Sequence, residues 1–460
     1  MSRNKTTLIN IICTIILEGV AFISGPIFSS MLGASNYGVY SVYGTWVGIA
    51  QIILSLQAGC ALVQARTEYP EKEQEKYQSS AITLGTISYM VFSLLIIIAA
   101  ALFRKSLGLS LVMVVLGLMQ GWGSFGVGFA NSKNTYEFRA DKNLFLSVST
   151  VVLTAAAQFI LVYNWKSEDN YWGMIIGQSL VIFIFGLVIF IAILKRGRCF
   201  VSRKYYSFTL PITLPLIVHS LMGIILNQSD RIMLQKMVSN SSVGIYTLAC
   251  TFASVINIIW TSLNRSWNPF YYEYMMRGQE EEIRRHSRNY LELYTIITMG
   301  FILLSREVFS IYASSEFRSG ADALPLFAFG YFFIFLYSFA TNYEMYYRKT
   351  KTVAVGTFMA ALVNIVLNYV LIIGFGMEGA VIATLLSDVF LFVFHFINAK
   401  RLKEKHLVYR LRDFAPWTAC VAISCVMFYL LKDMWLVRWG IGAVLGIYLA
   451  VKIVRRREIF

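Results

Sequence analysis

The stretch Leu210–Phe252, LPITLPLIVHSLMGIILNQSDRIMLQKMVSNSSVGIYTLACTF, decides the fold of this chain. It contains an apolar run, a short polar turn and the start of a second apolar run. The first run carries Asp230 next to Arg231. Hydrocarbon tolerates two such charges only when they face a cavity or each other, so the pair needs a partner or a function.

The rest of the chain repeats this pattern of apolar runs. Hydrophobic residues make up 57% of the 460 residues and charged residues 14%. Runs of about twenty apolar residues, the length that crosses a bilayer, recur throughout. We therefore expect an all-α polytopic membrane protein with about 14 transmembrane helices. The predicted spans are 8–32, 40–63, 81–103, 107–130, 144–163, 171–194, 212–235, 243–263, 290–312, 323–340, 352–373, 378–397, 414–431 and 436–454.

The basic residues predict the orientation. A net charge of +15 could suggest nucleic acid, but Lys and Arg gather at helix ends and in short loops, so no nucleic acid is expected as a partner. With the N-terminus inside, the inside segments carry 31 of the 40 Lys and Arg and the outside loops carry 8; Arg231 is the other. This alternation predicts a multi-pass protein with both termini in the cytoplasm.

Motifs for a soluble cofactor or a metal are missing from the sequence. The six cysteines are scattered, which predicts neither a disulfide framework nor a metal site. Gly121-Trp-Gly123-Ser-Phe-Gly126 has the spacing of a dinucleotide loop, but it lies inside an apolar run. That context favours close helix packing through small residues over nucleotide binding.

An internal repeat divides the chain. The segment Met31–Tyr40 aligns without a gap on Met237–Tyr246, at an offset of 206 residues. Gly173 and Gly379, which open the sixth and twelfth predicted spans, match at the same offset. The order of these anchors indicates a duplicated unit of six helices.

A third anchor extends the repeat. Arg139 precedes the fifth span as Arg348 precedes the eleventh, at an offset of 209. We expect two repeat-related six-helix bundles, 1–200 and 201–400, and two additional C-terminal transmembrane helices in 401–460. Because six is even, both bundles should share one orientation, with a substrate path between them near the midplane.

Several segments resemble one family. The run from Asp230-Arg231-Ile-Met to Gly244-Ile-Tyr246, together with the segments Val363–Asn368 and Gly379–Thr384, is similar to polysaccharide-repeat flippases of the O-antigen, capsule or teichuronic type. These belong to the multidrug/oligosaccharidyl-lipid/polysaccharide exporter superfamily. The resemblance implies movement of undecaprenyl-pyrophosphate-linked oligosaccharide repeat units across the bacterial inner membrane by alternating access. It also implies membrane lipids, a polysaccharide polymerase and other assembly proteins as partners.

Three other functions stay open. A cation-coupled multidrug antiporter of the same superfamily would differ in cargo rather than in fold. Lipid II flippases usually carry arginines in the first helix, whereas this one carries Glu18 and neither Arg nor Lys. A membrane polysaccharide polymerase or ligase needs an ordered outside segment, and the longest outside loop, 313–322, has about ten residues, so no enzyme is expected.

Four arginines are candidate cargo contacts. Arg66 and Arg265 lie at the inner ends of the second and eighth spans, and Arg139 and Arg348 precede the fifth and eleventh. The planar guanidinium donates two hydrogen bonds at once, which suits a pyrophosphate. The alternative is that these side chains only anchor the helix ends at the membrane surface.

Four further residues are candidates for ion coupling or gating: Glu18, Asp230, Arg231 and Glu344, with Asp388 as a secondary one. A carboxylate at the bilayer centre costs about 2.5–3.5 kcal/mol on insertion scales, so Glu18 must be paired, protonated or facing a cavity. No motif for ATP is present, and we expect a gradient of H⁺ or Na⁺, with no other cofactor. A fixed structural partner is the alternative for each.

Overall fold

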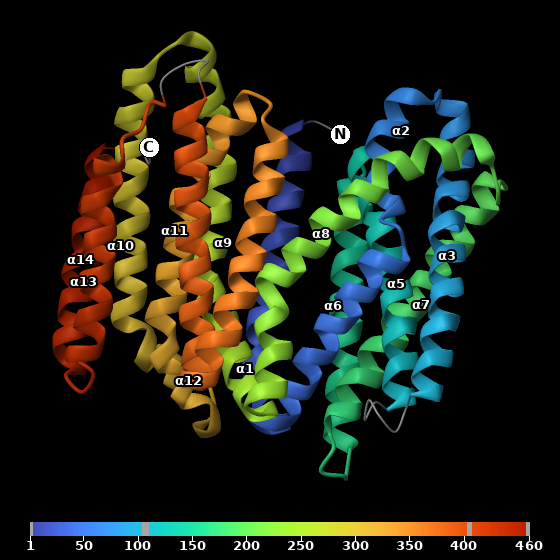
Figure 1. Cartoon of the computed structure of the whole chain (residues 1–460), viewed down its shortest axis with the longest axis horizontal. Coiled ribbons are helices and arrows are strands. Elements are labelled where there is room, and N and C mark those ends of the chain that lie inside the picture. Colours follow the sequence, from blue (N-terminus) through green and yellow to red (C-terminus); the bar gives the residue numbers. More distant parts are fainter. Residues whose placement is uncertain (1–2, 104–109, 403–406, 457–460) are drawn as a thin grey trace. The chain divides into compact units, whose positions relative to one another are not determined.

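The structure is a computed structural model that describes residues 3–103, 110–402 and 407–456; the side chains of 3–18, 21, 453, 455 and 456 lie outside that description. Every regular element in these ranges is a helix (Figure 1). The predicted all-α membrane fold is therefore confirmed.

The chain forms two compact units, Met1–Gln228 and Ser229–Phe460. The first contains α1 (Arg3–Leu54), η1 (Ala58–Ala61), α2 (Leu62–Glu68), α3 (Glu71–Leu102), α5 (Leu111–Tyr136), α6 (Ala140–Asn164), α7 (Tyr171–Gly197) and most of α8 (Arg203–Met237). The second contains the end of α8, α9 (Asn240–Arg277), α10 (Glu280–Tyr312), η2 (Ser315–Ala323), α11 (Leu324–Tyr346), α12 (Thr350–Arg401), α13 (Leu411–Leu430) and α14 (Trp435–Arg456). The expected division into 1–200, 201–400 and 401–460 stays a prediction.

Two long helices are interrupted at a glycine, and one of them, α12, is a hairpin. α12 has 52 residues, and its backbone leaves the helical region at Gly376 (φ 57°, ψ −129°). A Cβ at Gly379 would lie 2.9 Å from the backbone nitrogen of Ile372, although seven residues of straight helix span about 10 Å. The two arms of α12 are therefore antiparallel (Figure 1). α1 leaves the helical region in the same way at Gly33 (φ 73°, ψ 168°).

The described helices account for up to twelve membrane crossings. In the described residues eleven helices are long and apolar enough to cross a membrane, or twelve when the bent pair Phe22–Leu54 and Ala58–Glu68 counts as one span. The first arm of α1 and the second arm of α12 would supply the other two of the fourteen predicted crossings. The count of fourteen stays a prediction.

The turns before α6 and α12 share one backbone geometry. Phe138 (φ 56°) and Arg348 (φ 57°) are left-handed, and Arg139 and Lys349 follow them as the N-caps of α6 and α12. Arg139 therefore corresponds to Lys349, at an offset of 210. The pairing of Arg139 with Arg348 at 209 was wrong by one residue, because the helix end and not residue identity sets the register.

Small residues let the helices of the first unit approach closely. A Cβ at Gly123 would lie 2.8 Å from Phe183 Cα, and one at Gly126 would lie 3.0 Å from Gly186 Cα. Both contacts join α5 to α7. The prediction that Gly121–Gly126 is a helix-packing segment is confirmed, since only glycine permits this separation.

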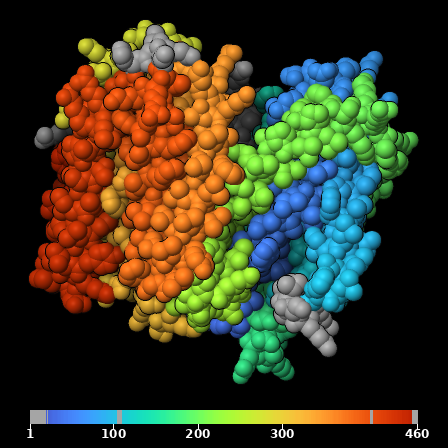
Figure 2. Space-filling view, viewed as in Figure 1, coloured from blue at the N-terminus to red at the C-terminus, as the bar shows by residue number. Residues whose placement is uncertain are grey.

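Aromatic side chains fill the second unit around α11. Tyr290 and Tyr294 of α10 pack on Phe335, with ring centroids 5.0 and 4.3 Å apart. Phe339 continues this cluster to Tyr409 in the connection between α12 and α13. Figure 2 shows the red α13–α14 pair at the outer edge of the unit, where exposed apolar side chains such as Val444 suit contact with lipid.

The close approach in α12 predicts a position-specific effect of added volume. Gly379→Ala should lower stability by about 1–3 kcal/mol because its Cβ meets the backbone of the opposite arm. Gly374→Ala is the matched control, because a Cβ there meets nothing within 4 Å. Thermal unfolding in detergent measures both. Equal midpoints for the two variants would contradict the hairpin.

Candidate functional site

Asp230 is the centre of a buried polar network in the second unit. Its side chain is 3% exposed. The Arg231 backbone N–H donates to Asp230 Oδ1 at 2.8 Å, and the Tyr246 hydroxyl donates to Oδ2. The Tyr246 oxygen lies 3.5 Å from Thr384 Oγ1. The Tyr246 hydroxyl of α9 thus connects Asp230 of α8 to the second arm of α12.

The local sequence explains how Tyr246 reaches this position. Ser239 is the N-cap of α9, and its hydroxyl accepts a hydrogen bond from the Ser242 backbone N–H at 3.1 Å. This cap starts α9 after the two-residue break that follows α8. Tyr246 then lies in the second turn of α9 and is 1% exposed.

The first unit holds an uncharged counterpart of this network. Tyr40 and Gln178 occupy the positions 206 residues before Tyr246 and Thr384. The Tyr40 hydroxyl donates to Gln178 Oε1 at 2.5 Å and accepts from Gln158 Nε2 at 3.1 Å. The residue 206 before Asp230 is Ser24. The repeat therefore conserves the polar contact between helices but places a carboxylate only in the second unit's copy.

A chain of amide and hydroxyl groups adjoins Asp230. Ser229, the preceding residue, donates to Asn364 Oδ1 at 3.2 Å, and Asn368 Nδ2 donates to the same oxygen at 2.9 Å. Both asparagines are fully buried. Among the described groups Asn368 Oδ1 has no hydrogen-bond partner. Amide oxygens are ligands for hard cations, and Asn368 Oδ1 is an acceptor that no described donor occupies.

The Arg231 side chain contacts a different residue of α9 from the one that Asp230 contacts. Its guanidinium interacts with Cys250 of α9, whose Sγ lies 3.7 Å from the Tyr331 hydroxyl of α11. Both adjacent charges therefore contact α9, Asp230 at Tyr246 and Arg231 at Cys250, which lies one turn farther along that helix. Asp388, in the second arm of α12, is 8% exposed and packs against Gly330 of α11.

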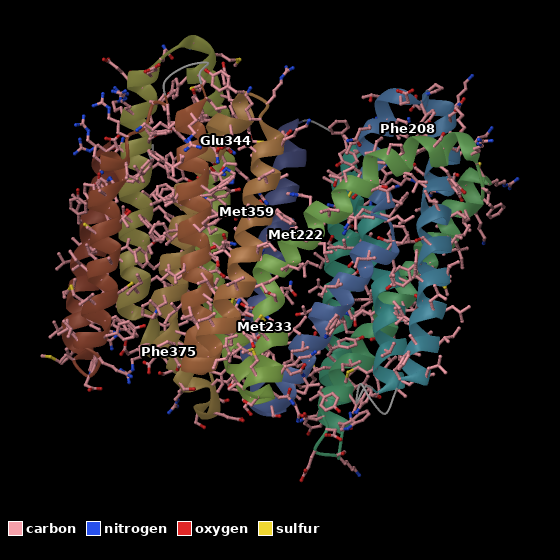
Figure 3. All side chains as sticks on the ribbon, viewed as in Figure 1. Phe208, Met222, Met233, Glu344, Met359 and Phe375 are labelled. Atoms are coloured by element: carbon pink, nitrogen blue, oxygen red, sulfur yellow. The ribbon has the colours of Figure 1, made fainter. Side chains whose placement is uncertain are left out.

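Glu344 has a partner that the sequence analysis did not identify. His395 Nδ1 lies 2.6 Å from Glu344 Oε2, and both side chains are fully buried. Figure 3 shows Glu344 near one end of α11. Glu344 Oε1 and His395 Nε2 have no hydrogen-bond partner within the described structure. The pair joins the end of α11 to the second arm of α12.

The four candidate cargo arginines differ in their surroundings. Arg66 of α2 and Arg265 of α9 are exposed, and in the described residues neither forms an ion pair or a hydrogen bond. Arg139 is bound to Glu137, with Nη1 3.1 Å from Oε2. Arg348 is exposed in the turn before α12. Arg66 and Arg265 lie in different units, and their use by one cargo stays a prediction.

Glu18 belongs to α1, but its side chain lies outside the described residues. The other residues that sequence reasoning missed are Asn364, Thr384 and His395. A signal for them existed, because polar side chains inside apolar spans are costly and usually paired. The pairing itself depends on which helices pack together, and that is visible only in the fold.

Two protein-family models match this chain. The model of a family described as polysaccharide biosynthesis protein matches residues 4–275, more than half of the chain. The chain belongs to this family. A second family model, lipid II flippase MurJ, matches residues 273–450. The protein is thus a membrane flippase of the multidrug/oligosaccharidyl-lipid/polysaccharide exporter superfamily and not an enzyme.

Individual relatives of this flippase are distant in sequence. The probable low-salt glycan biosynthesis flippase Agl15 of Haloferax volcanii is 20% identical over 382 residues, 82% of this chain and 79% of that protein. A structure of the lipid II flippase MurJ in an inward closed conformation aligns with a TM-score of 0.68 and 15% identity, covering 98% and 99% of the chains. An inward-facing multidrug resistance transporter of the same superfamily aligns at 0.57 and 14%, covering 88% and 96%. These structures show a shared fold.

Because the Tyr246 hydroxyl binds Asp230, we expect its removal to lower the stability of the protein more than removal of an ordinary buried hydroxyl. Tyr246→Phe removes a donor to a buried carboxylate and should destabilise the protein by about 1.5–3 kcal/mol. Tyr294→Phe is the matched control: its buried hydroxyl donates to a neutral acceptor, Ile256 O, at 3.2 Å, and its loss should cost about 0.5–1.5 kcal/mol. The double variant Asp230→Asn/Tyr246→Phe should recover part of the loss in a double-mutant cycle. Additive losses would show that the two residues are not coupled.

Proposed function

We propose that this flippase moves undecaprenyl-pyrophosphate-linked oligosaccharide repeat units across the bacterial inner membrane by alternating access. The observation that carries the proposal is the polysaccharide biosynthesis family match over residues 4–275. The name of the Haloferax relative, a glycan biosynthesis flippase, supports it. Both termini would face the cytoplasm, and a polysaccharide polymerase acting outside would consume the cargo.

Arg66 and Arg265 fit the cargo's pyrophosphate. They are exposed cations that form no ion pair or hydrogen bond within the described residues, so their guanidinium donors are available to an anion. Arg139 is less suited because Glu137 already neutralises part of its charge. A guanidinium donates two hydrogen bonds to phosphate oxygens, which makes it a stronger ligand than an ammonium.

A lipid II flippase is the second candidate. The match of the MurJ family model to residues 273–450 favours it. Its cargo carries the same undecaprenyl pyrophosphate, so phosphate-binding residues alone do not separate the two functions. Transport of polysaccharide repeat units is preferred over transport of lipid II, because the polysaccharide biosynthesis family model matches the longer part of the chain.

Reconstituted vesicles test the cargo and the arginines together. The parent protein should move a fluorescent undecaprenyl-pyrophosphate oligosaccharide faster than it moves lipid II. Arg66→Ala/Arg265→Ala should lower that rate by at least tenfold, because two charge-assisted contacts of about 1.5–3 kcal/mol each are lost.

The control for this experiment removes the same charge elsewhere. Arg203→Ala/Arg277→Ala replaces two exposed arginines that begin α8 and end α9, and it should transport like the parent. A preference for lipid II would replace the proposed function with the second candidate. Equal loss in both double variants would assign the arginines to membrane anchoring.

Energy for transport is proposed to come from a gradient of H⁺ or Na⁺. Three carboxylates are coupling candidates: Glu18, Asp230 with its oxygen-rich neighbours Ser229 and Asn368, and Glu344 with its buried histidine partner. A coupling carboxylate must exchange its ion between two states of the protein. Arg231 would serve gating, because it joins α8 to α9.

Glu18→Gln keeps size and hydrogen bonding but removes the titratable charge. Transport by this variant should no longer depend on an imposed pH or Na⁺ gradient. Asp230→Asn and Glu344→Gln, measured in the same vesicles, are the comparison variants. A Glu18→Gln protein that responds to both gradients as the parent does would exclude Glu18 as the coupling site, and the variant that loses the response would identify it.

A further inference from the structure

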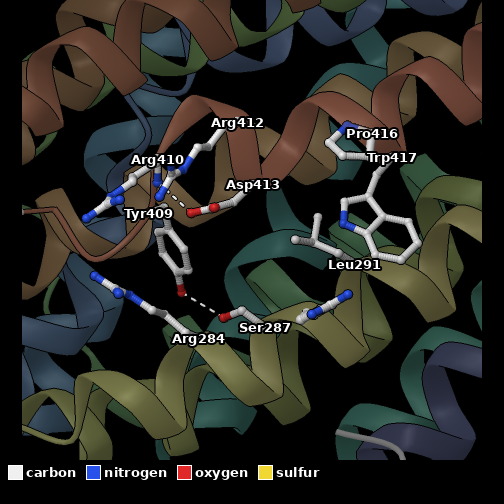
Figure 4. Close-up of a pocket in the computed structure, with 10 residues that line it drawn as sticks. Arg284, Ser287, Leu291, Tyr409, Arg410, Arg412, Asp413, Pro416 and Trp417 are labelled. Carbon is white, nitrogen blue, oxygen red and sulfur yellow. Dashed lines mark hydrogen bonds between the residues drawn. The ribbon is translucent and has the colours of Figure 1, made fainter.

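A cationic cavity lies within the second unit, apart from the Asp230 network. Its volume is about 470 Å³. The walls come from α10, from the connection before α13 and from the first turns of α13 (Figure 4). The lining residues are Arg284, Ser287, Arg288, Leu291, Tyr409, Arg410, Arg412, Asp413, Pro416 and Trp417.

Positive charge dominates the polar lining of this cavity. Four arginines line it against one carboxylate, Asp413, which accepts a hydrogen bond from the Arg410 backbone N–H at 2.8 Å. Arg284 is held in place, because its Nε donates to Val408 O at 3.1 Å. Arg288 and Arg412 are exposed, and no ion pair or hydrogen bond of either is found in the described residues. An anion would therefore find guanidinium donors without a competing partner.

The side of the cavity away from Arg410 carries apolar residues. Figure 4 shows Trp417, Pro416 and Leu291 on the side away from Arg410. Farther along α13, Ile423 and Val426 are 56% and 55% exposed, as expected for a helix face in contact with acyl chains. Tryptophan is typical of the boundary between headgroups and hydrocarbon. The cavity thus combines an anion site with an adjoining apolar surface.

Tyr409 gives the cavity a fixed neutral hydrogen-bonding group. Its oxygen lies 2.9 Å from Ser287 Oγ, and Tyr409 is 5% exposed. Burial raises the pKa of its hydroxyl, so the phenol keeps its proton. A phosphate oxygen in the cavity would meet a donor here without charge repulsion.

We propose that this cavity binds the phosphate headgroup of an anionic membrane phospholipid, with the lipid's acyl chains along the exposed face of α13. Basic pockets between transmembrane helices are suited to such headgroups. The site goes beyond the proposed transport of a lipid-linked sugar, because its residues are none of the candidate cargo or coupling residues. Its ligand would join α13 to α10 through their charges.

Native mass spectrometry of the full-length protein, titrated with one lipid at a time, tests the site. Phosphatidylglycerol should bind in preference to phosphatidylcholine with the same acyl chains. Arg288→Gln/Arg412→Gln should weaken phosphatidylglycerol binding by about 30-fold. Two arginines are lost, and each contributes about the same factor to the attraction of an anionic lipid. Thermal unfolding checks that the double variant is folded, and the two single variants provide the readout if it is not.

The matched control is Arg277→Gln/Arg285→Gln, which removes two exposed arginines of α9 and α10 outside the cavity. It should bind phosphatidylglycerol like the parent. Equal binding of the two lipids, or equal weakening in both double variants, would overturn the proposal. Tighter binding of undecaprenyl pyrophosphate with displacement of phosphatidylglycerol would overturn it in favour of the cargo. None of these outcomes depends on transport, so the proposed function stands or falls separately.

Discussion

Hydrocarbon offers no hydrogen-bond partners, and this constraint determines the rest of the structure. Backbone groups must pair within each crossing segment, so the described chain is helical wherever it is regular. Reversals then need residues that accept a left-handed backbone, as Gly33 and Gly376 do inside α1 and α12. Polar side chains obey the same rule, and the buried ones pair across helices, as Tyr40 does with Gln178.

The two copies of the repeat satisfy this rule with different chemistry. In the first unit the contact between Tyr40 and Gln178 is neutral, and breaking it would expose only dipoles. In the second unit Tyr246 binds the carboxylate of Asp230, and breaking that contact would leave a charge without its donor. Protonation of Asp230, or a cation bound to it, would therefore disturb this contact, whereas the neutral contact between Tyr40 and Gln178 contains no group that titrates near neutral pH.

Sequence reasoning was accurate where a single helix carries the information. The length of the apolar runs predicted the helical fold. The segment from Asp230 to Tyr246 predicted the exporter superfamily. It failed where helix packing decides: His395 lies 51 residues from Glu344, and no spacing rule joins them. The pairing of Arg139 with Arg348 also failed, because the left-handed residue before each helix, Phe138 or Arg348, sets the register and the identity of the arginine does not. The longer connection 165–170 between α6 and α7 then accounts for the change of offset from 210 to 206 at Gly173 and Gly379.

The C-terminal pair α13–α14, which is predicted to lie outside the repeat, is held to α10 at two separate positions along that helix. Arg438 is fully buried, and its guanidinium donates to Leu303 O at 2.9 Å and to Glu307. Near the other end of α10, Ser287 contacts Tyr409 at 2.9 Å. Ser287 and Leu303 are about 24 Å apart along the helix, most of the thickness of a hydrocarbon core. If the pair slid or hinged relative to α10, the buried Arg438 guanidinium would lose its partners, which costs several kcal/mol. The pair should therefore move with α10, and the cationic cavity between them should keep its shape while other helices rearrange.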